Sequence, residues 1–123
     1  MAAFRMALEM GVKAVELDVH QTSDGRLVVI HDDDLRRTGR RLGRVKDLLF
    51  TDMRRVDVGA WYDRRFKGER PPALEEVFDL CSGKAELHVE IKQGSSLYPG
   101  IEKRVVGLIA RRKAWRAACV SSF

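Results

Sequence analysis

Apolar and polar residues alternate along two short segments of the chain, residues 12–19 and 86–92. This alternation is typical of β-strands, because successive side chains of a strand point to opposite faces of a sheet. A third apolar segment, 26–30, follows the turn residues 23–25, and a fourth lies at 117–121. We expect four strands, with the first two joined as a hairpin.

Between the strands, apolar residues recur at the three- and four-residue spacing of a helix face. The Gly- and Arg-rich segment 36–46 is expected to be a loop. The later half of the chain alternates helix and strand, which favours an α/β fold whose parallel sheet is covered by helices. The predicted helices are residues 1–10, 47–55, 73–81 and 101–113.

The composition fits one folded domain and changes the picture mainly through its charge. The chain has 123 residues, of which 45% are apolar and 33% charged, with a formal net charge of +5. Segment 36–46 carries six positive charges and no acid, so subtracting it leaves a net charge of −1. Few aromatic residues lie near this segment, so a nucleic-acid-binding module is the less favoured interpretation. The same charges can attract an anionic substrate.

The two cysteines and the N-terminus give weaker indications. Cys81 and Cys119 lack the dense spacing of a disulfide scaffold or a zinc site, so we expect both to be reduced, buried and structural. The first residues lack the apolar core of a signal peptide, and no apolar run is long enough to span a membrane. These features predict a cytoplasmic protein without a transmembrane segment.

Two of the predicted strands carry acidic side chains on the face opposite their apolar residues. Glu16 and Asp18 alternate with valine and leucine, and Glu90 and Lys92 do the same in the later strand. The alternation of strands and helices predicts that this second face is also enclosed, where a carboxylate must be paired or bound to a metal. Glu16, Asp18 and Glu90 suit Mg²⁺ or Ca²⁺, which prefer oxygen ligands. The alternative is a solvated face of an antiparallel sheet.

His31 ends the second strand and is a candidate for proton transfer. If Asp24 and Gly25 form a two-residue turn, Asp18 lies opposite His31, with Cβ atoms roughly 4.5–5.5 Å apart. A histidine beside a carboxylate cluster suits general acid–base catalysis. The alternative is an ordinary surface histidine.

Six short motifs follow one another over nearly the whole chain. They are Val15-Glu16-Leu17-Asp18-Val19, Thr22-Ser23-Asp24-Gly25, Val28-Val29-Ile30-His31-Asp32, the segment 68–77, Val89-Glu90-Ile91-Lys92 and Ser121-Ser122-Phe123. In content and order they resemble the glycerophosphodiester phosphodiesterase family. The resemblance implies a TIM (β/α)₈ barrel and a metal-dependent hydrolysis of glycerophosphodiesters to glycerol 3-phosphate and an alcohol.

The resemblance also implies roles for individual residues. Glu16, Asp18 and Glu90 match the metal ligands of the family, and the metal is expected to be Mg²⁺ or Ca²⁺. His31 matches one of two catalytic histidines, and Lys92 matches a residue beside the phosphate. His20 and His88 match no assigned position, so we expect structural or supporting roles for them.

The sequence also departs from the family pattern. The His-Arg-Gly motif of the first strand, which carries the other catalytic histidine, is absent, and the loop 37–43 lacks the usual Arg-Thr-Thr-Asn-Gly character. A barrel of this type needs about 250 residues. We therefore expect residues 1–123 to be a domain fragment, roughly half of a barrel, without its first strand and its C-terminal strands.

Three alternatives remain open at the sequence level. One is a catalytically inactive half-barrel whose open sheet edges favour self-association. Another is a lipid phosphodiesterase similar to lysophospholipase D or sphingomyelinase D. The third concerns Trp61, Tyr62 and Phe66, which form either a wall for the substrate or ordinary loop packing.

Overall fold

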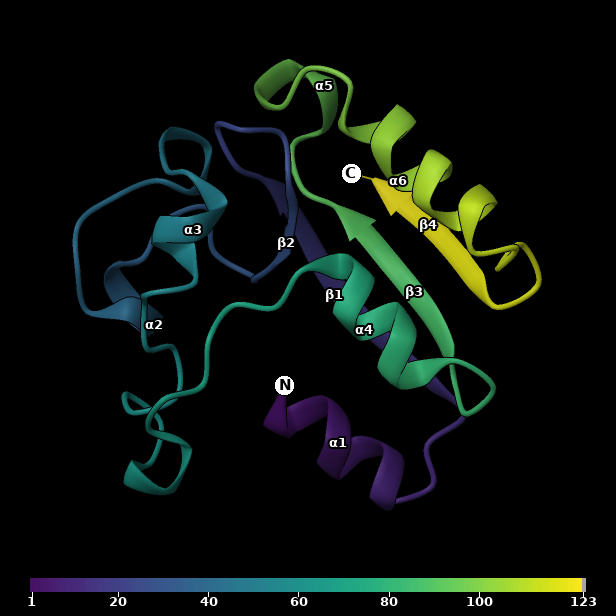
Figure 1. Cartoon of the computed structure of the whole chain (residues 1–123), viewed down its shortest axis with the longest axis horizontal. Coiled ribbons are helices and arrows are strands. Elements are labelled where there is room, and N and C mark those ends of the chain that lie inside the picture. Colours follow the sequence, from purple (N-terminus) through teal and green to yellow (C-terminus); the bar gives the residue numbers. More distant parts are fainter. Residues whose placement is uncertain (123) are drawn as a thin grey trace.

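The computed structural model describes residues 1–122, apart from the side chain of residue 95 (Figure 1). The last residue of the sixth motif, residue 123, lies outside the described residues. The elements in chain order are α1 (Ala2–Glu9), β1 (Ala14–Gln21), β2 (Leu27–Val29), α2 (Arg36–Gly39), the 3₁₀ turn η1 (Val45–Asp47), α3 (Phe50–Met53), the 3₁₀ turn η2 (Arg64–Phe66), α4 (Leu74–Cys81), β3 (Glu86–Ile91), α5 (Gly94–Leu97), α6 (Ile101–Arg111) and β4 (Ala118–Ser122).

The four strands form one open sheet in the order β2-β1-β3-β4. β1, β3 and β4 run parallel, whereas β2 pairs antiparallel with β1 as the second arm of a hairpin. Figure 1 shows α4 crossing in front of β1 and β3, with α6 beside β4. The predicted hairpin, parallel sheet and covering helices are confirmed.

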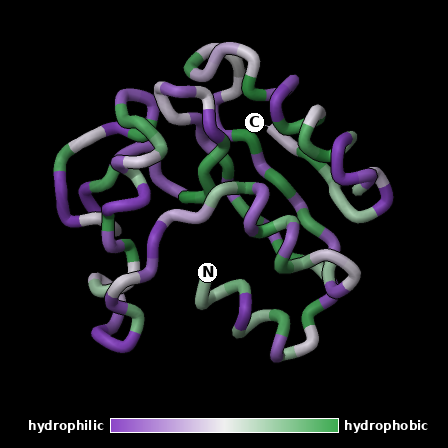
Figure 2. Tube along the Cα trace, in the orientation of Figure 1, coloured by the Kyte–Doolittle hydropathy of each residue, from purple (hydrophilic) through white to green (hydrophobic). Residues whose placement is uncertain are grey.

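The main core lies between the sheet and these helices. The odd-numbered residues 15, 17 and 19 of β1 and 87, 89 and 91 of β3 are all at most 9% exposed and pack against apolar residues of α4 and α6. In Figure 2 the hydrophobic stretches of the trace gather where these strands and α4 lie together. Burying each such side chain contributes about 1.5–3 kcal/mol. A register slip of one residue would move the carboxylates into this core, so the same packing fixes the face on which they lie.

The hairpin register differs by one residue from the prediction. Val19 pairs with Val29, whereas a two-residue turn would have paired Asp18 with His31. The connection is a three-residue loop, 23–25, closed by a hydrogen bond between the backbones of its flanking residues and ending at a glycine with φ of 76°. Such loops end in a left-handed residue, which glycine adopts readily. His31 therefore lies one residue beyond the position opposite Asp18.

The secondary structure between residues 35 and 56 differs from the prediction. The expected loop 36–46 contains α2 and part of η1, and the expected helix 47–55 is reduced to the short α3. Leu35 and Val45 are fully buried in a second, smaller core beside β2. The sequence did not predict the burial of Leu35 and Val45, because most residues between them are charged or glycine and the charged side chains face solvent.

The polar face of the sheet is open, which corrects two expectations. Glu16 and His88 are exposed, so the second face is not enclosed by the part of the chain that the structure describes.

Cys81 is buried but Cys119 is exposed, and both are free thiols. Cys119 pairs with His88 across β3 and β4, which places it on the polar face. No helix within residues 1–122 is long and apolar enough to cross a bilayer.

Candidate metal and acid–base site

Three carboxylates converge on the polar face of β1 and β3. The parallel register pairs Asp18 with Glu90, and Glu16 lies two residues earlier on the same face. One oxygen atom of each carboxylate lies within 4.8 Å of the others. Asp18 and Glu90 are half-buried, and Glu16 is exposed. The structure thus brings together the three residues that the sequence proposed as metal ligands.

The electrostatics of this cluster favour a bound cation. Burial and the neighbouring negative charges of Asp18 and Glu90 raise the pKa of Glu16, because each effect disfavours its ionised form. A divalent cation would reverse this effect. Three converging carboxylate oxygens are also the donor set that Mg²⁺ and Ca²⁺ accept. The residues therefore fit a hard divalent cation.

Lys92 supplies a positive charge at the edge of the cluster. Its Nζ lies 2.5 Å from Oε1 of Glu90 and 3.0 Å from Oδ1 of Asp18. These hydrogen bonds, with Glu90 first and Asp18 next, raise the pKa of Lys92. The ammonium group therefore stays protonated and offsets part of the negative charge.

His31 is oriented by the residue that follows it. Its side chain is 69% exposed, and its Nδ1 lies 2.8 Å from Oδ1 of Asp32. Arg37 donates two hydrogen bonds to the same carboxylate, from Nε to Oδ2 at 2.7 Å and from Nη2 to Oδ1 at 2.9 Å. These hydrogen bonds are the main cause of the low pKa of Asp32, about 2. An ionised carboxylate only accepts hydrogen bonds, so neutral His31 carries its hydrogen on Nδ1. Nε2 is left free to take up a proton.

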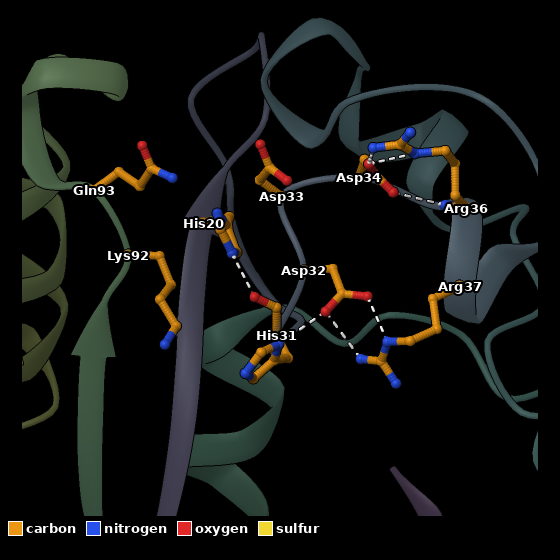
Figure 3. Close-up of a pocket in the computed structure, with 9 residues that line it drawn as sticks. All are labelled: His20, His31, Asp32, Asp33, Asp34, Arg36, Arg37, Lys92 and Gln93. Carbon is orange, nitrogen blue, oxygen red and sulfur yellow. Dashed lines mark hydrogen bonds and ion pairs between the residues drawn. The ribbon is translucent and has the colours of Figure 1, made fainter.

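An open pocket of about 500 Å³ lies between Lys92 and His31, where β2 and β3 end. Figure 3 shows the side chains of Lys92 and His31 entering the same region from the segments that follow β3 and β2. Catalytic groups of α/β barrels collect at this end of their strands. The pocket is lined by His20, His31, Asp32, Asp33, Asp34, Arg36, Arg37, Lys92 and Gln93.

The basic segment contributes less free charge than its composition suggests. Arg37 binds Asp32, Arg36 binds Asp34 at 2.5 Å, and Lys46 binds its neighbour in sequence at 3.0 Å. Half of the six cations are therefore paired. This pairing weakens the nucleic-acid interpretation and places two of the arginines at the pocket instead.

The sequence did not identify the pairing of Arg37 with Asp32, because the loop departs from the family pattern. A histidine followed by an aspartate was visible, but the partner of that aspartate depends on how the loop folds. His20 has the supporting position that was expected: it is 1% exposed and reaches the backbone of His31. His88 is exposed beside Glu16 in the strand register.

The aromatic cluster Trp61, Tyr62 and Phe66 lies outside this pocket. Successive ring centroids are 5.9 and 6.0 Å apart, and the three residues line a separate apolar groove against α1. Its link to the site is Arg37, whose guanidinium lies 5.2 Å from the centroid of the Trp61 ring. This arrangement favours loop packing over a wall for the substrate.

Fold and site together define an α/β barrel-type protein with a carboxylate cluster, a lysine and an oriented histidine at one end of a parallel sheet. The sequence model of the Glycerophosphoryl diester phosphodiesterase family matches residues 1–118. The chain belongs to this family, which confirms the resemblance of its motifs.

Individual relatives agree with this assignment. The chain is 43% identical to a glycerophosphodiester phosphodiesterase of Caldanaerobacter subterraneus subsp. tengcongensis, over 99% of the chain and 51% of that protein. It is 38% identical to one of Bacillus altitudinis, again over 51% of the relative. The chain thus spans about half the length of these curated relatives.

Solved structures give the same proportion. A glycerophosphodiester phosphodiesterase of Agrobacterium tumefaciens matches with a TM-score of 0.90 and 34% identity, over 99% of this chain and 50% of that one. An Oleispira antarctica phosphodiesterase in complex with its product sn-glycerol-3-phosphate matches with a TM-score of 0.91 and 27% identity, over 99% and 50%. The open four-stranded sheet is therefore about half of the family's TIM barrel.

Proposed function

We propose that this chain carries the metal-binding half of the active site of a phosphodiesterase that hydrolyses glycerophosphodiesters to glycerol 3-phosphate and an alcohol. The observation that carries the proposal is the convergence of Glu16, Asp18 and Glu90 beside Lys92, in a chain that belongs to this family. The relative from Oleispira antarctica, bound to sn-glycerol-3-phosphate, supports the choice of product.

In this proposal the three carboxylates hold Mg²⁺ or Ca²⁺. When bound, such an ion supplies positive charge to phosphate oxygens on which negative charge develops. Lys92, which contacts Asp18 and Glu90 and also lines the pocket of His31, provides a second cation and draws the phosphate toward His31. Arg36 and Arg37 also line this pocket, but their pairing with Asp34 and Asp32 leaves little net positive charge from them.

His31 transfers a proton through Nε2. Asp32 holds Nδ1–H, stabilises the imidazolium that forms, and keeps the ring in one orientation. Hydrolysis requires removal of a proton from the nucleophile and delivery of a proton to the leaving alcohol. In the family resemblance these two tasks are divided between two histidines, of which His31 is one.

An inactive half-barrel is the second candidate function. The observation behind it is that the 123 residues include one histidine at a matched catalytic position, His31, and no His-Arg-Gly motif. In this case the chain binds the cation but does not turn over substrate. A choice between the two candidates therefore needs separate measurements of cation binding and hydrolysis.

Calorimetric titration of the purified chain with Ca²⁺ and Mg²⁺ tests the cation site. We expect one site, weakened at least about tenfold in Glu90→Gln, because one of three anionic ligands is lost. The matched control is Glu9→Gln, the same substitution at an exposed residue of α1. Equal binding by both variants would refute the assignment of Glu90.

Release of glycerol 3-phosphate from glycerophosphocholine, measured with the same protein and cation, tests the reaction. Turnover that disappears in His31→Ala, while cation binding remains, supports the enzyme. Cation binding without turnover supports the inactive half-barrel. Turnover in His31→Ala equal to that of the unmodified chain would contradict the role of His31.

A further inference from the structure

A buried pair of side chains, His20 and Tyr98, lies directly beneath the proposed acid–base residue. His20 is 1% exposed and Tyr98 is 2% exposed. Nδ1 of His20 lies 2.8 Å from the Tyr98 hydroxyl, and Nε2 lies 3.1 Å from the backbone carbonyl oxygen of His31. Figure 3 shows His20 on β1 pointing to that carbonyl from the pocket side.

The hydrogen-bond partners of His20 determine which of its ring nitrogens carries a hydrogen atom. A backbone carbonyl only accepts hydrogen bonds, so Nε2 of His20 must carry the hydrogen that it donates to His31. Nδ1 is then unprotonated and accepts the hydrogen of the Tyr98 hydroxyl. The two rings also meet edge to face, with centroids 5.5 Å apart at 77°. The carbonyl of His31 therefore selects the tautomer of His20, and the Tyr98 hydroxyl helps to fix the orientation of the ring.

Nε2 of His20 anchors the backbone just beyond the last hydrogen bond between the two arms of the hairpin. The amide of Ile30 donates to the carbonyl of Asp18 at 3.1 Å, just beyond the last residue of β2. The chain then leaves β1, and the carbonyl of the following residue, His31, is bound by the side chain of His20. Since the imidazole of His31 is mostly exposed, its position depends on Asp32 and on this backbone anchor.

We propose that His20, oriented by Tyr98, is a positioning residue that fixes the backbone of His31 and thereby the direction of its imidazole. Its effect on catalysis rests on the proposed function. Tyr98 belongs to the connection that follows Lys92, and its amide is itself bound to the carbonyl of Gly94 at 2.9 Å. The pair thus joins the two connections from which Lys92 and His31 enter the pocket.

Nuclear magnetic resonance of the ¹⁵N-labelled full chain tests this proposal without any turnover. We expect long-range ¹H–¹⁵N spectra to show His20 as the Nε2–H tautomer, and to show the same tautomer in Tyr98→Phe, because the carbonyl of His31 can only accept a hydrogen bond. Loss of one hydrogen bond of about 1 kcal/mol corresponds to roughly fivefold. Amide exchange at Ile30 should therefore accelerate about fivefold in His20→Ala, while the amide of Val89 in the centre of β3 changes less than about twofold.

Two further variants separate positioning from simple stability. His20→Gln keeps a donor and an acceptor, so it should restore Ile30 exchange to within about twofold of the unmodified chain. His88→Ala removes the exposed histidine of the same sheet face and should leave amide exchange at both Ile30 and Val89 unchanged. Equal acceleration at Ile30 and Val89, or an Nδ1–H tautomer of His20, would overturn the proposal.

Activity provides an independent measurement. If the chain hydrolyses glycerophosphocholine, His20→Ala should lower kcat about fivefold with little change in KM, and His20→Gln should recover most of it. An increase in KM with unchanged kcat would contradict positioning. If the unmodified chain shows no turnover, the proposed function fails, whereas the exchange and tautomer data still decide the role of His20.

Discussion

Replacement of Asp32 by asparagine should destabilise the chain in a manner that depends on pH. The pKa of Asp32 is lowered from 3.8 to about 2, first by its hydrogen bonds to Arg37. A difference of this size corresponds to roughly 2 kcal/mol of stability in the ionised form. Asp32 is 22% exposed but Arg37 is 52% exposed, so screening by solvent reduces the expected loss to about 1–2 kcal/mol.

The sign of the pH dependence follows from the lowered pKa. The contribution of Asp32 is fully present above the pKa of the unfolded chain, near 3.8, and is lost as the pH falls through about 2. Urea unfolding followed by circular dichroism at pH 7 and at about pH 3 measures it. The difference between the unmodified chain and Asp32→Asn should shrink by roughly half at the lower pH.

A matched variant makes this test specific. Asp34→Asn disrupts the neighbouring pair with Arg36, which is 72% exposed, so its effect at pH 7 should be smaller. A loss in Asp32→Asn that is the same at both pH values would refute the electrostatic origin of the effect. A loss no larger than that of Asp34→Asn would refute the special role of Arg37.

Three further predictions concern the fold around the site. Leu17→Ala should lower the free energy of unfolding by about 2–5 kcal/mol in urea titrations, because Leu17 is only 3% exposed in the core. A loss below about 1 kcal/mol would contradict this packing. Asp57 accepts backbone hydrogen bonds from Gly59, Ala60 and Gly68, which lower its pKa to about 2. Asp57→Asn should therefore lower Tm at pH 7 by more than it does near pH 2, and an equal decrease at both pH values would contradict this. With an aromatic disulfide reagent, exposed Cys119 should react rapidly in the native chain, and buried Cys81 only on unfolding. Burial shields the Cys81 thiol and also raises its pKa. Rapid reaction of both thiols in the native chain would contradict the burial of Cys81.

The carboxylate cluster was predictable from the sequence because one physical rule determines it. Alternation along β1 and β3 assigns Glu16, Asp18 and Glu90 to the face opposite the core. The parallel register then brings Asp18 and Glu90 side by side. Packing of the apolar residues fixes that register, and their pattern is visible in the sequence.

The hairpin register was not predictable with the same certainty. Residues 23–25 permit either a two-residue or a three-residue connection, and each contains glycine at a position that favours positive φ. The choice depends on hydrogen bonds of Asp24, whose Oδ1 accepts from Thr22 at 2.6 Å and from the amide of Phe50 at 3.0 Å. The second of these partners lies 26 residues away, so no local pattern reveals it.

The different environments of the histidines also require the folded structure. His20 and His88 lie on the same face of the sheet, yet the first is 1% exposed and the second is exposed. Tyr98 and the residues after β2 cover His20. Those contacts join segments 78 and 11 residues apart, so alternation alone cannot distinguish a buried histidine from a surface one.

The position of Lys92 gives β1 and β3 an internal counter-ion. Like charges opposed on neighbouring strands weaken a sheet, and Asp18 and Glu90 would repel each other at its centre. The ammonium group, bound to both carboxylates, offsets this repulsion within the chain itself. Without that amine, the stability of the sheet would follow the concentration of free divalent cation, because binding to the folded state alone shifts the folding equilibrium. Lys92 therefore compensates the paired carboxylates of the folded chain without a divalent cation.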